Sequence, residues 1–293
     1  MKGAVYKIRA WAGMVALSHT VFALPFAASA VALSLRGPHQ PLTPLRVLAL
    51  LGCMVTARTS AMAFNRWADR KIDAENPRTK SRHVPSGEVK PAEALGLAAL
   101  SGLAFVAIAA TLGPMTLALS PIALAVLLGY SYAKRFTSAA HLWLGVALSL
   151  APAGAWIAMG APLRAGIVLL MAAVMTWLFG FDILYSLQDE EFDKKRGLYS
   201  VPSRFGTRTS VVISAVAHVG TVAALAAAGF SLGCGPLYYV GVAASAALLV
   251  YEHALVGWGR LEKIDKAFFD VNAWVSVGFF ALTALDTWRA LSR

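Results

Sequence analysis

Charged side chains and cysteines are both scarce in this chain. Only 14% of its 293 residues are Asp, Glu, Lys or Arg, 58% are hydrophobic, and the mean hydropathy is +0.64. A water-soluble domain needs a far more polar surface, so a soluble protein is excluded. The two cysteines, Cys53 and Cys234, lie within or beside apolar segments and offer no paired framework for a disulfide or a thiolate metal site.

Strand-like alternation of polar and apolar residues is also absent, which argues against a lipid-facing barrel. The chain has long apolar runs instead, and about 20 such residues let a helix cross a hydrocarbon core. Nine runs fit this requirement: 11–34, 44–66, 93–111, 115–132, 138–159, 163–186, 209–231, 235–257 and 268–288. We therefore expect an all-α, polytopic integral membrane bundle of nine transmembrane helices, forming a single domain over residues 1–293.

The first run has features of a cleavable secretory signal, because basic residues precede it and Ala28-Ser29-Ala30 lies near its end. Apolar character continues to Leu35, however, and this favours a retained first helix.

The basic residues predict the orientation in the membrane. With the N-terminus inside, twenty Lys and Arg residues fall in inner segments and five in outer ones. The excess of basic residues on cytoplasmic loops then places the N-terminus in the cytoplasm and the C-terminus outside. The net charge of +11 is thus gathered at one membrane face, without the interleaved aromatic residues of a nucleic-acid groove. We expect the lipid bilayer and an anionic substrate as partners, no nucleic acid and no obligate protein partner.

Two long charged segments on the predicted cytoplasmic side each begin with a stripe of oxygen-bearing residues. The spacings of four and seven put the members of a stripe on one helix face; they are Asn65, Asp69 and Asp73 in the first stripe and Asp182, Asp189 and Asp193 in the second. Basic residues and a Val-Pro-Ser tail follow each stripe, at 84–86 and 201–203. This similarity suggests two pseudo-repeated four-helix halves plus one helix.

Clustered carboxylates repel one another unless a cation sits between them. Mg²⁺ takes oxygen ligands and is usually held by one or two carboxylates plus substrate phosphates. Two acidic stripes facing each other, with Arg and Lys alongside, therefore indicate a site for a metal-bound diphosphate. A charge run is more often a solvated loop, and we accept that interpretation for Lys71, Glu75, Glu190 and Glu191.

Ionisable residues within apolar helices are costly and indicate function. Arg58 lies seven residues before Asn65 on the same predicted face, where it could hold a substrate carboxylate; the structural alternative is a buried pair with Asp182. Tyr130 and Lys134, four apart, would share a helix face, although an interfacial Tyr with a snorkelling Lys is also common. We assign no chemistry to His19, Glu252, His253 and Asp286, and expect the last of these to reach water.

At these residues the sequence resembles the UbiA family of intramembrane aromatic prenyltransferases, over nearly the whole chain. The family's first motif, Asn-Asp-x-x-Asp-x-x-x-Asp, matches residues 65–73 (NRWADRKID), and its second matches 182–193 (DILYSLQDEEFD). Its Tyr-x-x-x-Lys element matches 130–134. One position departs from the pattern: the acid after the motif's asparagine is Arg66, so we expect the first motif to hold its metal with fewer carboxylates.

The resemblance implies nine helices around a cavity open to the membrane, two Mg²⁺ ions, and transfer of a polyprenyl group from its diphosphate to a ring carbon of an aromatic acid in respiratory quinone biosynthesis. The first choice of acceptor is 4-hydroxybenzoate, the ubiquinone precursor. A dihydroxynaphthoate of menaquinone biosynthesis stays open, because residues 65–66, 76–79 and 188–189 are also like family members with that role. A membrane transporter is the alternative from another class, but charges concentrate at one face only.

The resemblance also implies roles for single residues, and a location in the bacterial inner membrane with the active site facing the cytoplasm. The catalytic residues would be Asp69, Asp73, Asp182, Asp189 and Lys134. The metal ligands would be Asn65, Asp69, Asp73, Asp189 and Asp193, and the substrate-binding residues Arg58, Asn65, Arg78, Arg82, Tyr130, Lys134 and Asp182.

Overall fold

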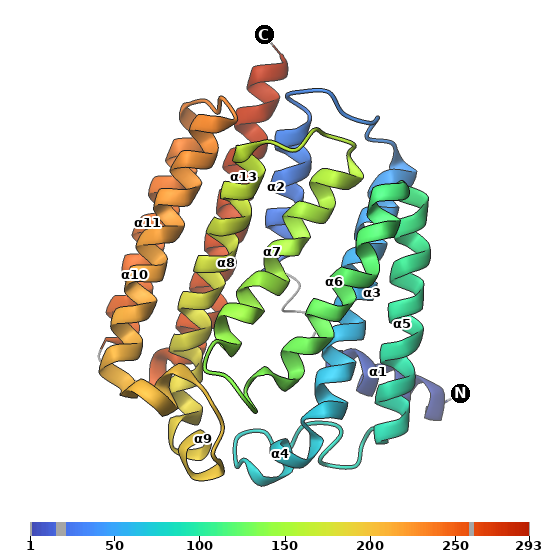
Figure 1. Ribbon diagram of the computed structural model, residues 1–293, viewed down its shortest axis with the longest axis vertical. Coiled ribbons are helices and arrows are strands. Elements are labelled where there is room, and N and C mark those ends of the chain that lie inside the picture. Colours follow the sequence, from blue (N-terminus) through green and yellow to red (C-terminus); the bar gives the residue numbers. More distant parts are fainter. Residues whose placement is uncertain (1, 16–21, 258–260, 293) are drawn as a thin grey trace. The chain divides into compact units, whose positions relative to one another are not determined.

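The computed structural model describes residues 2–15, 22–257 and 261–292 of the chain. Helices are the regular secondary structure throughout this described part, which contains no strand. The chain forms two compact units: unit 1 comprises Met1–Thr20 and Thr43–Tyr132, and unit 2 comprises Val21–Leu42 and Ala133–Arg293. Figure 1 shows the helices of both units.

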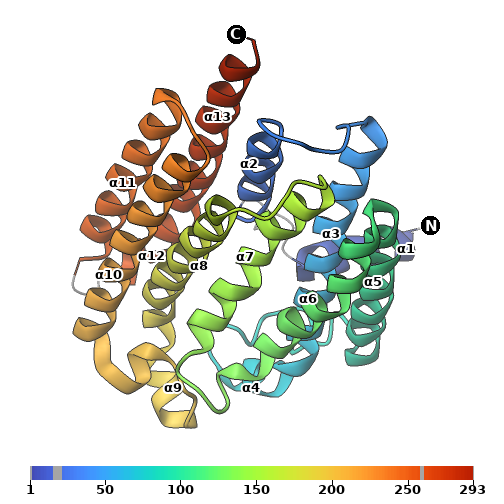
Figure 2. The same ribbon diagram turned by 45° about the horizontal axis from the view of Figure 1, so that its top comes forward.

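Unit 1 is built around a pair of long helices. Its elements are α1 (Lys2–Val15), α3 (Pro44–Ala68), α4 (Arg70–Glu75), α5 (Pro91–Leu112) and α6 (Pro114–Ala133). Helix α3 packs along α5, α1 lies against α3, and α6 runs beside them (Figures 1 and 2). A proline begins each of the three long helices, at the position where its missing N–H costs no hydrogen bond.

The charged loop between α4 and α5 is anchored by apolar side chains. Val84 and Val89 are buried in a cluster with residues of three helices: Ala10 and Met14 of α1, Ala63 of α3, and Ala94 and Ala98 of α5. Burial of these side chains holds the polar segment that follows the first motif against the end of the helices.

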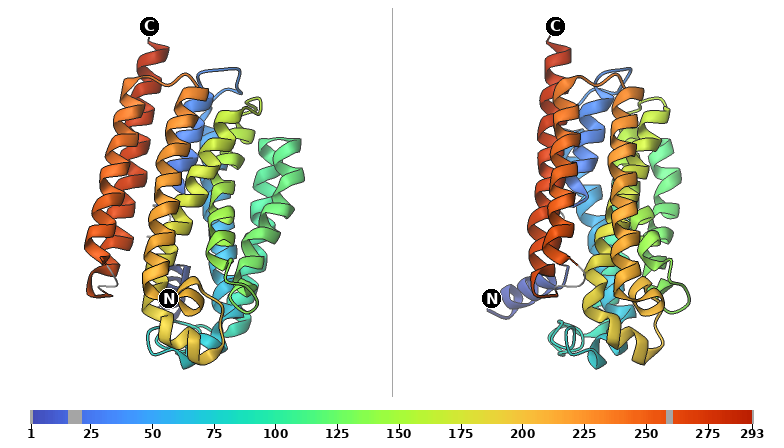
Figure 3. Two further views of the ribbon diagram at one scale, coloured as in Figure 1. Left: turned by 60° about the vertical axis from the view of Figure 1, so that its left-hand side comes forward. Right: turned by 90° about the vertical axis from the view of Figure 1, so that its left-hand side faces the viewer.

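Unit 2 contains the remaining helices. They are α2 (Leu24–Ser34), α7 (Ala140–Ala158), α8 (Ala165–Ser186), α9 (Glu190–Arg196), α10 (Val201–Ser231), α11 (Pro236–Val256), α12 (Ile264–Lys266) and α13 (Asn272–Leu291). Helix α8 packs between α7 and α10, α11 lies along α13, and α2 lies against α7 and α13. Figure 3 shows α11 and α13 side by side, and in Figure 1 the C-terminus and α9 lie at opposite ends of this unit.

Eight helices within the described residues are long and apolar enough to cross a membrane. They occupy eight of the nine predicted runs, so the prediction of an all-α integral membrane protein is confirmed. Their ends differ from the prediction by a few residues in most cases. The main exception is α10, which begins at Val201 instead of 209 and bends at Gly206, whose φ of 77° lies in the left-handed region that glycine tolerates.

The first predicted span, 11–34, is wrong as a single helix. Helix α1 ends at Val15, Phe22 and Ala23 form a turn, and α2 begins at Leu24; residues 16–21, with His19, lie outside the described residues. Pro25 explains the break, because proline is tolerated in the first turn of a helix but disrupts its interior. The 11 residues of α2 fall short of a spanning length. The count of nine spans, their orientation, the single domain and the pseudo-repeat therefore stay predictions.

Candidate active site

The first motif is interrupted by a break in the helix. Helix α3 ends at Ala68, Asp69 has φ −90° and ψ 2°, and α4 begins at Arg70. Two backbone hydrogen bonds nevertheless keep the spacing of four: Asp69 N–H donates to Asn65 O at 2.9 Å, and Asp73 N–H donates to Asp69 O at 2.8 Å. The three motif residues therefore stay on consecutive turns.

Side-chain contacts in the first motif leave one carboxylate oxygen without a partner. Asn65 Nδ2 donates to Asp69 Oδ2 at 2.9 Å, and Arg82 Nη1 donates to Asp73 Oδ1 at 2.8 Å. Asp73 is only 5% exposed, and its Oδ2 is buried with no hydrogen-bond partner among the described residues. A buried unsatisfied carboxylate oxygen is costly, which makes this atom a candidate ligand for a cation.

Arg66, the residue that departs from the family motif, is part of the same cluster. Its Nη1 lies 3.4 Å from Asn65 Oδ1. The guanidinium also interacts electrostatically with two acidic side chains, Asp69 and Asp73, and with two basic ones, Arg78 and Arg82. Arg66 is thus within electrostatic range of two arginines and two aspartates, and such a gathering of guanidinium groups attracts a polyanion such as diphosphate.

The second motif repeats the local geometry of the first. Helix α8 ends at Ser186, a single 3-10 turn covers Leu187–Asp189, and α9 begins at Glu190. Asp189 has φ −102° and ψ 3°, close to the values of Asp69. Asp193, four residues further along, is 3% exposed, and its Oδ2 has no hydrogen-bond partner among the described residues, as is the case for Asp73.

Asp182, the first residue of the second motif, pairs with a histidine that the sequence analysis missed. His141 Nδ1 lies 2.6 Å from Asp182 Oδ2, and the His141 side chain is completely buried. A histidine in the first turn of an apolar helix, seven residues after Lys134, was the available signal.

Helix α6, which carries Tyr130, ends at Ala133, and Lys134 lies in the turn that follows. The Lys134 carbonyl accepts a hydrogen bond from Tyr199 N–H at 2.8 Å, and this ties the turn to the segment after α9. Tyr130 and Arg58, both in unit 1, are partly buried. Arg78 is exposed, and its backbone N–H donates to Asn76 Oδ1 at 2.9 Å.

The oxygen atoms in the two motifs suit Mg²⁺ better than a metal whose ligands all come from protein side chains. Within the described residues of either unit, no three His, Cys, Asp or Glu side chains form a group that could hold a metal ion alone. Mg²⁺ does not require such a group, since it keeps several waters and binds one or two carboxylates together with substrate phosphates. The buried, unpartnered oxygens of Asp73 and Asp193 supply carboxylate donors of this kind, one in each motif.

Residues 23–281 match the UbiA prenyltransferase family. The chain belongs to this family. A 4-hydroxybenzoate octaprenyltransferase of Sodalis glossinidius is 33% identical over 216 residues, which cover 73% of this chain and 74% of that protein. The apo structure of a UbiA homologue from Aeropyrum pernix K1 is 33% identical, with a TM-score of 0.82 over 92% of this chain and 98% of that one.

A further UbiA homologue, from Archaeoglobus fulgidus, has been solved with GPP and Mg²⁺ bound. It is 18% identical to this chain, with a TM-score of 0.69 over 94% of this chain and 99% of that one, so the two share the fold. The prediction of a membrane-embedded prenyltransferase is confirmed by the family assignment and by the helices described above.

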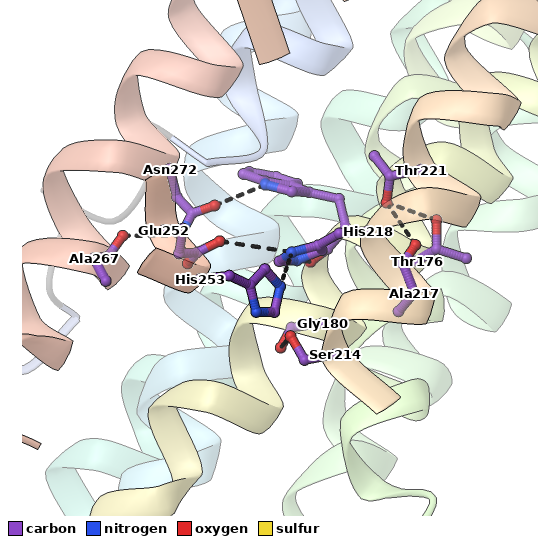
Figure 4. A network of polar contacts seen from close by, with 11 residues as sticks. Thr176, Gly180, Ser214, Ala217, His218, Thr221, Glu252, His253, Ala267 and Asn272 are labelled. Atoms are coloured by element: carbon purple, nitrogen blue, oxygen red, sulfur yellow. Dashed lines mark hydrogen bonds and ion pairs between the residues drawn. The ribbon is translucent and has the colours of Figure 1, made fainter. Parts of the chain in front are cut away.

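This UbiA-family chain has a second polar cluster in unit 2, shown in Figure 4. Asn272 Nδ2 donates to Glu252 Oε1 at 2.7 Å, and Trp177 Nε1 donates to Asn272 Oδ1 at 2.7 Å. His218 Nδ1 lies 3.0 Å from His253 Nε2. The cluster joins α8, α10, α11 and α13, so it links four helices through buried polar groups and supports a structural role for Glu252 and His253.

The expectation that Asp286 reaches water is wrong for this UbiA-family protein. Asp286 is 5% exposed, and its Oδ2 lies 2.5 Å from Arg36 Nη2 and accepts a hydrogen bond from Gly235 N–H at 2.7 Å. Arg36 also donates to Thr287 Oγ1 at 3.0 Å and to Gly233 O at 3.1 Å. The partner of Asp286 lies 250 residues away in the sequence, beyond the reach of any local pattern.

Proposed function

We propose that the protein transfers a polyprenyl group from polyprenyl diphosphate to a ring carbon of 4-hydroxybenzoate, with Mg²⁺ as cofactor, in ubiquinone-type quinone biosynthesis. The observation that carries this choice of acceptor is the similarity to 4-hydroxybenzoate octaprenyltransferases, 33% identical over almost three quarters of the chain in the Sodalis protein. The two aspartate motifs agree with a diphosphate donor, because both combine buried carboxylates with nearby basic residues.

We assign the proposed metal and diphosphate contacts to the two motifs. The residues proposed to hold two Mg²⁺ ions, directly or through water, are Asn65, Asp69, Asp73, Asp189 and Asp193. When bound, the metal ions neutralise the charge that develops on the departing diphosphate. The basic side chains of Arg78, Arg82 and Lys134 donate hydrogen bonds to the diphosphate oxygens, which strengthens the same stabilisation.

The remaining site residues serve the acceptor and the reacting centre. Arg58 lies in α3, two turns before Asn65, and its guanidinium is suited to a bidentate grip on the carboxylate of an aromatic acid. Tyr130 and Asp182 contribute polar contacts to the diphosphate group of the prenyl donor. Apolar helix walls keep water from the allylic carbocation, so that the electron-rich ring carbon beside the phenol captures it instead.

We further propose that the protein resides in the bacterial inner membrane with its active site facing the cytoplasm. The support is the distribution of basic residues: with the N-terminus inside, twenty fall in predicted inner segments and five in predicted outer ones.

A dihydroxynaphthoate is the second candidate acceptor, and it would place the enzyme in menaquinone biosynthesis. The sequences Asn65-Arg66, Asn76-Pro77-Arg78-Thr79 and Gln188-Asp189 favour it. Either acid carries the carboxylate that Arg58 is proposed to bind, so this residue does not distinguish the two.

The test uses purified protein in detergent with geranyl or octaprenyl diphosphate, Mg²⁺, and each of the two acids in parallel. We expect release of diphosphate and formation of a C-prenylated 4-hydroxybenzoate, and loss of both with EDTA. If only the dihydroxynaphthoate is prenylated, it replaces 4-hydroxybenzoate as the proposed acceptor. If neither acid reacts with any metal, and the protein in liposomes accumulates a charged solute, the transporter alternative replaces the enzyme.

A further inference from the structure

His141 and Asp182 form the shortest contact between an imidazole and a carboxylate in the described part of the chain. His141 is the second residue of α7, and Asp182 lies four residues before the end of α8. Nδ1 of the histidine is 2.6 Å from Oδ2 of the aspartate, with the imidazole fully buried and the Asp182 side chain 14% exposed. The contact therefore joins a buried residue to a motif residue that stays accessible.

The packing of α7 against α8 enforces this contact. A Cβ placed on Gly145, one turn beyond His141, would lie 2.5 Å from the carbonyl oxygen of Met175, so no larger residue fits without moving a helix. On the other side of α8, a Cβ at Gly180 would lie 2.3 Å from His218. Ser214 Oγ also donates to the Gly180 carbonyl at 2.8 Å, which fixes α8 just before Asp182.

The chemistry of the pair determines which atoms remain available. A carboxylate oxygen accepts hydrogen bonds, so Nδ1 of His141 is assigned as the donor to Oδ2 of Asp182. Nε2 is buried without a hydrogen-bond partner among the described residues. His141 is also the one described side chain that bonds the Asp182 carboxylate, so Oδ1 is left for a ligand.

The position of the Asp182 carboxylate beside α7 adds a favourable interaction with the helix dipole. Because His141 is in the first turn of α7, the carboxylate that it binds lies near the N-terminus of that helix, where the helix dipole stabilises negative charge. The N-cap residue Ala139 makes no side-chain capping bond.

We propose that His141 is a positioning residue: it fixes Oδ2 of Asp182 and thereby aims Oδ1 at the magnesium diphosphate. The inference rests on the proposed prenyl transfer and adds a residue that the family motifs do not contain. Hydrogen-bond partners behind a ligand typically change affinity or activity by about 10- to 100-fold when removed. The competing interpretation is that His141 merely braces α7 against α8.

The test compares three substitutions at His141. His141→Leu removes the donor, His141→Asn keeps an N–H donor at the Nδ1 position, and His141→Gln moves its amide to the Nε2 position. We expect kcat/KM for the prenyl diphosphate to fall about 10- to 100-fold in His141→Leu and His141→Gln, with a rise in KM for the diphosphate and little change in KM for the aromatic acid. His141→Asn should recover to within about threefold.

Two controls separate positioning from bracing. His253→Leu removes a partly buried histidine from the cluster of Figure 4 in the same unit, and should lower thermal stability without changing the diphosphate KM. Combining His141→Leu with Asp182→Asn should add little to the larger single effect, because the two residues act as one unit.

Binding of geranyl S-thiolodiphosphate, an unreactive donor analogue, in the presence of Mg²⁺ provides a readout that does not depend on turnover. Weaker binding by His141→Leu, restored in His141→Asn, supports the proposal even if no acceptor reacts. Unchanged analogue binding and kcat/KM in His141→Leu would overturn it, as would equal losses in the Leu and Asn variants. Lack of turnover by the unchanged protein with every acceptor would instead count against the proposed function.

Discussion

Nη1 of Arg82 lies 2.8 Å from Oδ1 of Asp73, nine residues earlier in the chain. The contact crosses from the loop after α4 back to the motif, and it leaves Oδ2 of the same carboxylate buried without a partner. Arg82 therefore holds Oδ1 of Asp73 in place, while Oδ2 remains available for a ligand. The same guanidinium is proposed above to bind the diphosphate, so this arginine would combine two tasks.

Arg82→Ala should impair the enzyme more than Arg82→Lys. Loss of the guanidinium leaves the buried Asp73 carboxylate without its counter-charge and removes a proposed charge-assisted hydrogen bond to the diphosphate. We expect diphosphate-analogue affinity to fall at least tenfold in the alanine variant and less in the lysine variant, as measured by titration in detergent. Unchanged affinity in Arg82→Ala would remove the assigned role.

Asp69→Ala and Asp189→Ala should each abolish turnover while the protein remains folded and inserted. Both aspartates sit at the break between a long helix and a short one, and both are proposed metal ligands. We expect a loss of more than about 100-fold in kcat/KM, since a metal-bound diphosphate depends on its carboxylates. Glu191→Ala is the matched control, because Glu191 lies within the second motif but is exposed. Near-normal rates in either aspartate variant would show that the residue is not a ligand.

Arg66→Asp restores the acid that the family motif usually carries at this position. The substitution exchanges a cation for an anion beside Asp69 and Asp73, so the local charge falls by two. We expect half-maximal activity at a lower Mg²⁺ concentration, and weaker binding of the diphosphate analogue at saturating Mg²⁺, each by about tenfold, as for a partly screened charge interaction. Arg66→Gln serves as the neutral intermediate and should lie between the two.

Arg58→Ala should weaken binding of the aromatic acid more than binding of the prenyl diphosphate. Removal of a guanidinium that grips a carboxylate costs about 2 kcal/mol or more, so the KM for the acid should rise at least about 30-fold while the KM for the diphosphate changes little. The check is a two-substrate kinetic analysis. Equal losses for both substrates would exclude a specific role in carboxylate binding.

The Arg36–Asp286 pair predicts a stability effect. Removing one partner of a buried ion pair typically costs about 3–5 kcal/mol, because the other charge is left uncompensated. Asp286→Ala should therefore lower the midpoint of thermal unfolding in detergent clearly. The control is Glu191→Ala, which removes an exposed pair with Lys195 at 3.9 Å and should leave the midpoint unchanged. A wild-type midpoint in Asp286→Ala would mean that the pair contributes nothing to stability.

Local patterns in the sequence were sufficient for most of the helices. A run of about 20 apolar residues has few structural options in a membrane, so α3, α5–α8, α11 and α13 were expected close to their observed positions. The one misjudged span had a visible signal in Pro25, whose position marks a helix start. The motif residues four apart also stay on consecutive turns at the helix break at Asp69, because backbone hydrogen bonds cross that break.

Side-chain contacts between segments far apart in the chain could not be predicted from the sequence. Asp182 and His141 are 41 residues apart, and the glycine that lets their helices approach, Gly145, does not differ in the sequence from glycines that face open space. Arg36 and Asp286 were both visible as charges near predicted helix ends, but nothing in their neighbourhoods paired them. Such side-chain partners depend on tertiary packing, which composition and periodicity do not encode.

The matched backbone angles at Asp69 and Asp189 give this enzyme an internal reference for mutagenesis. Each long helix stops at an aspartate of nearly the same conformation, and each short helix that follows carries a buried aspartate four residues on, Asp73 or Asp193. A change made in one motif can therefore be repeated at the equivalent residue of the other within the same protein. Any difference between the two results then measures how far the two motifs differ in their tasks, independently of expression, detergent or lipid.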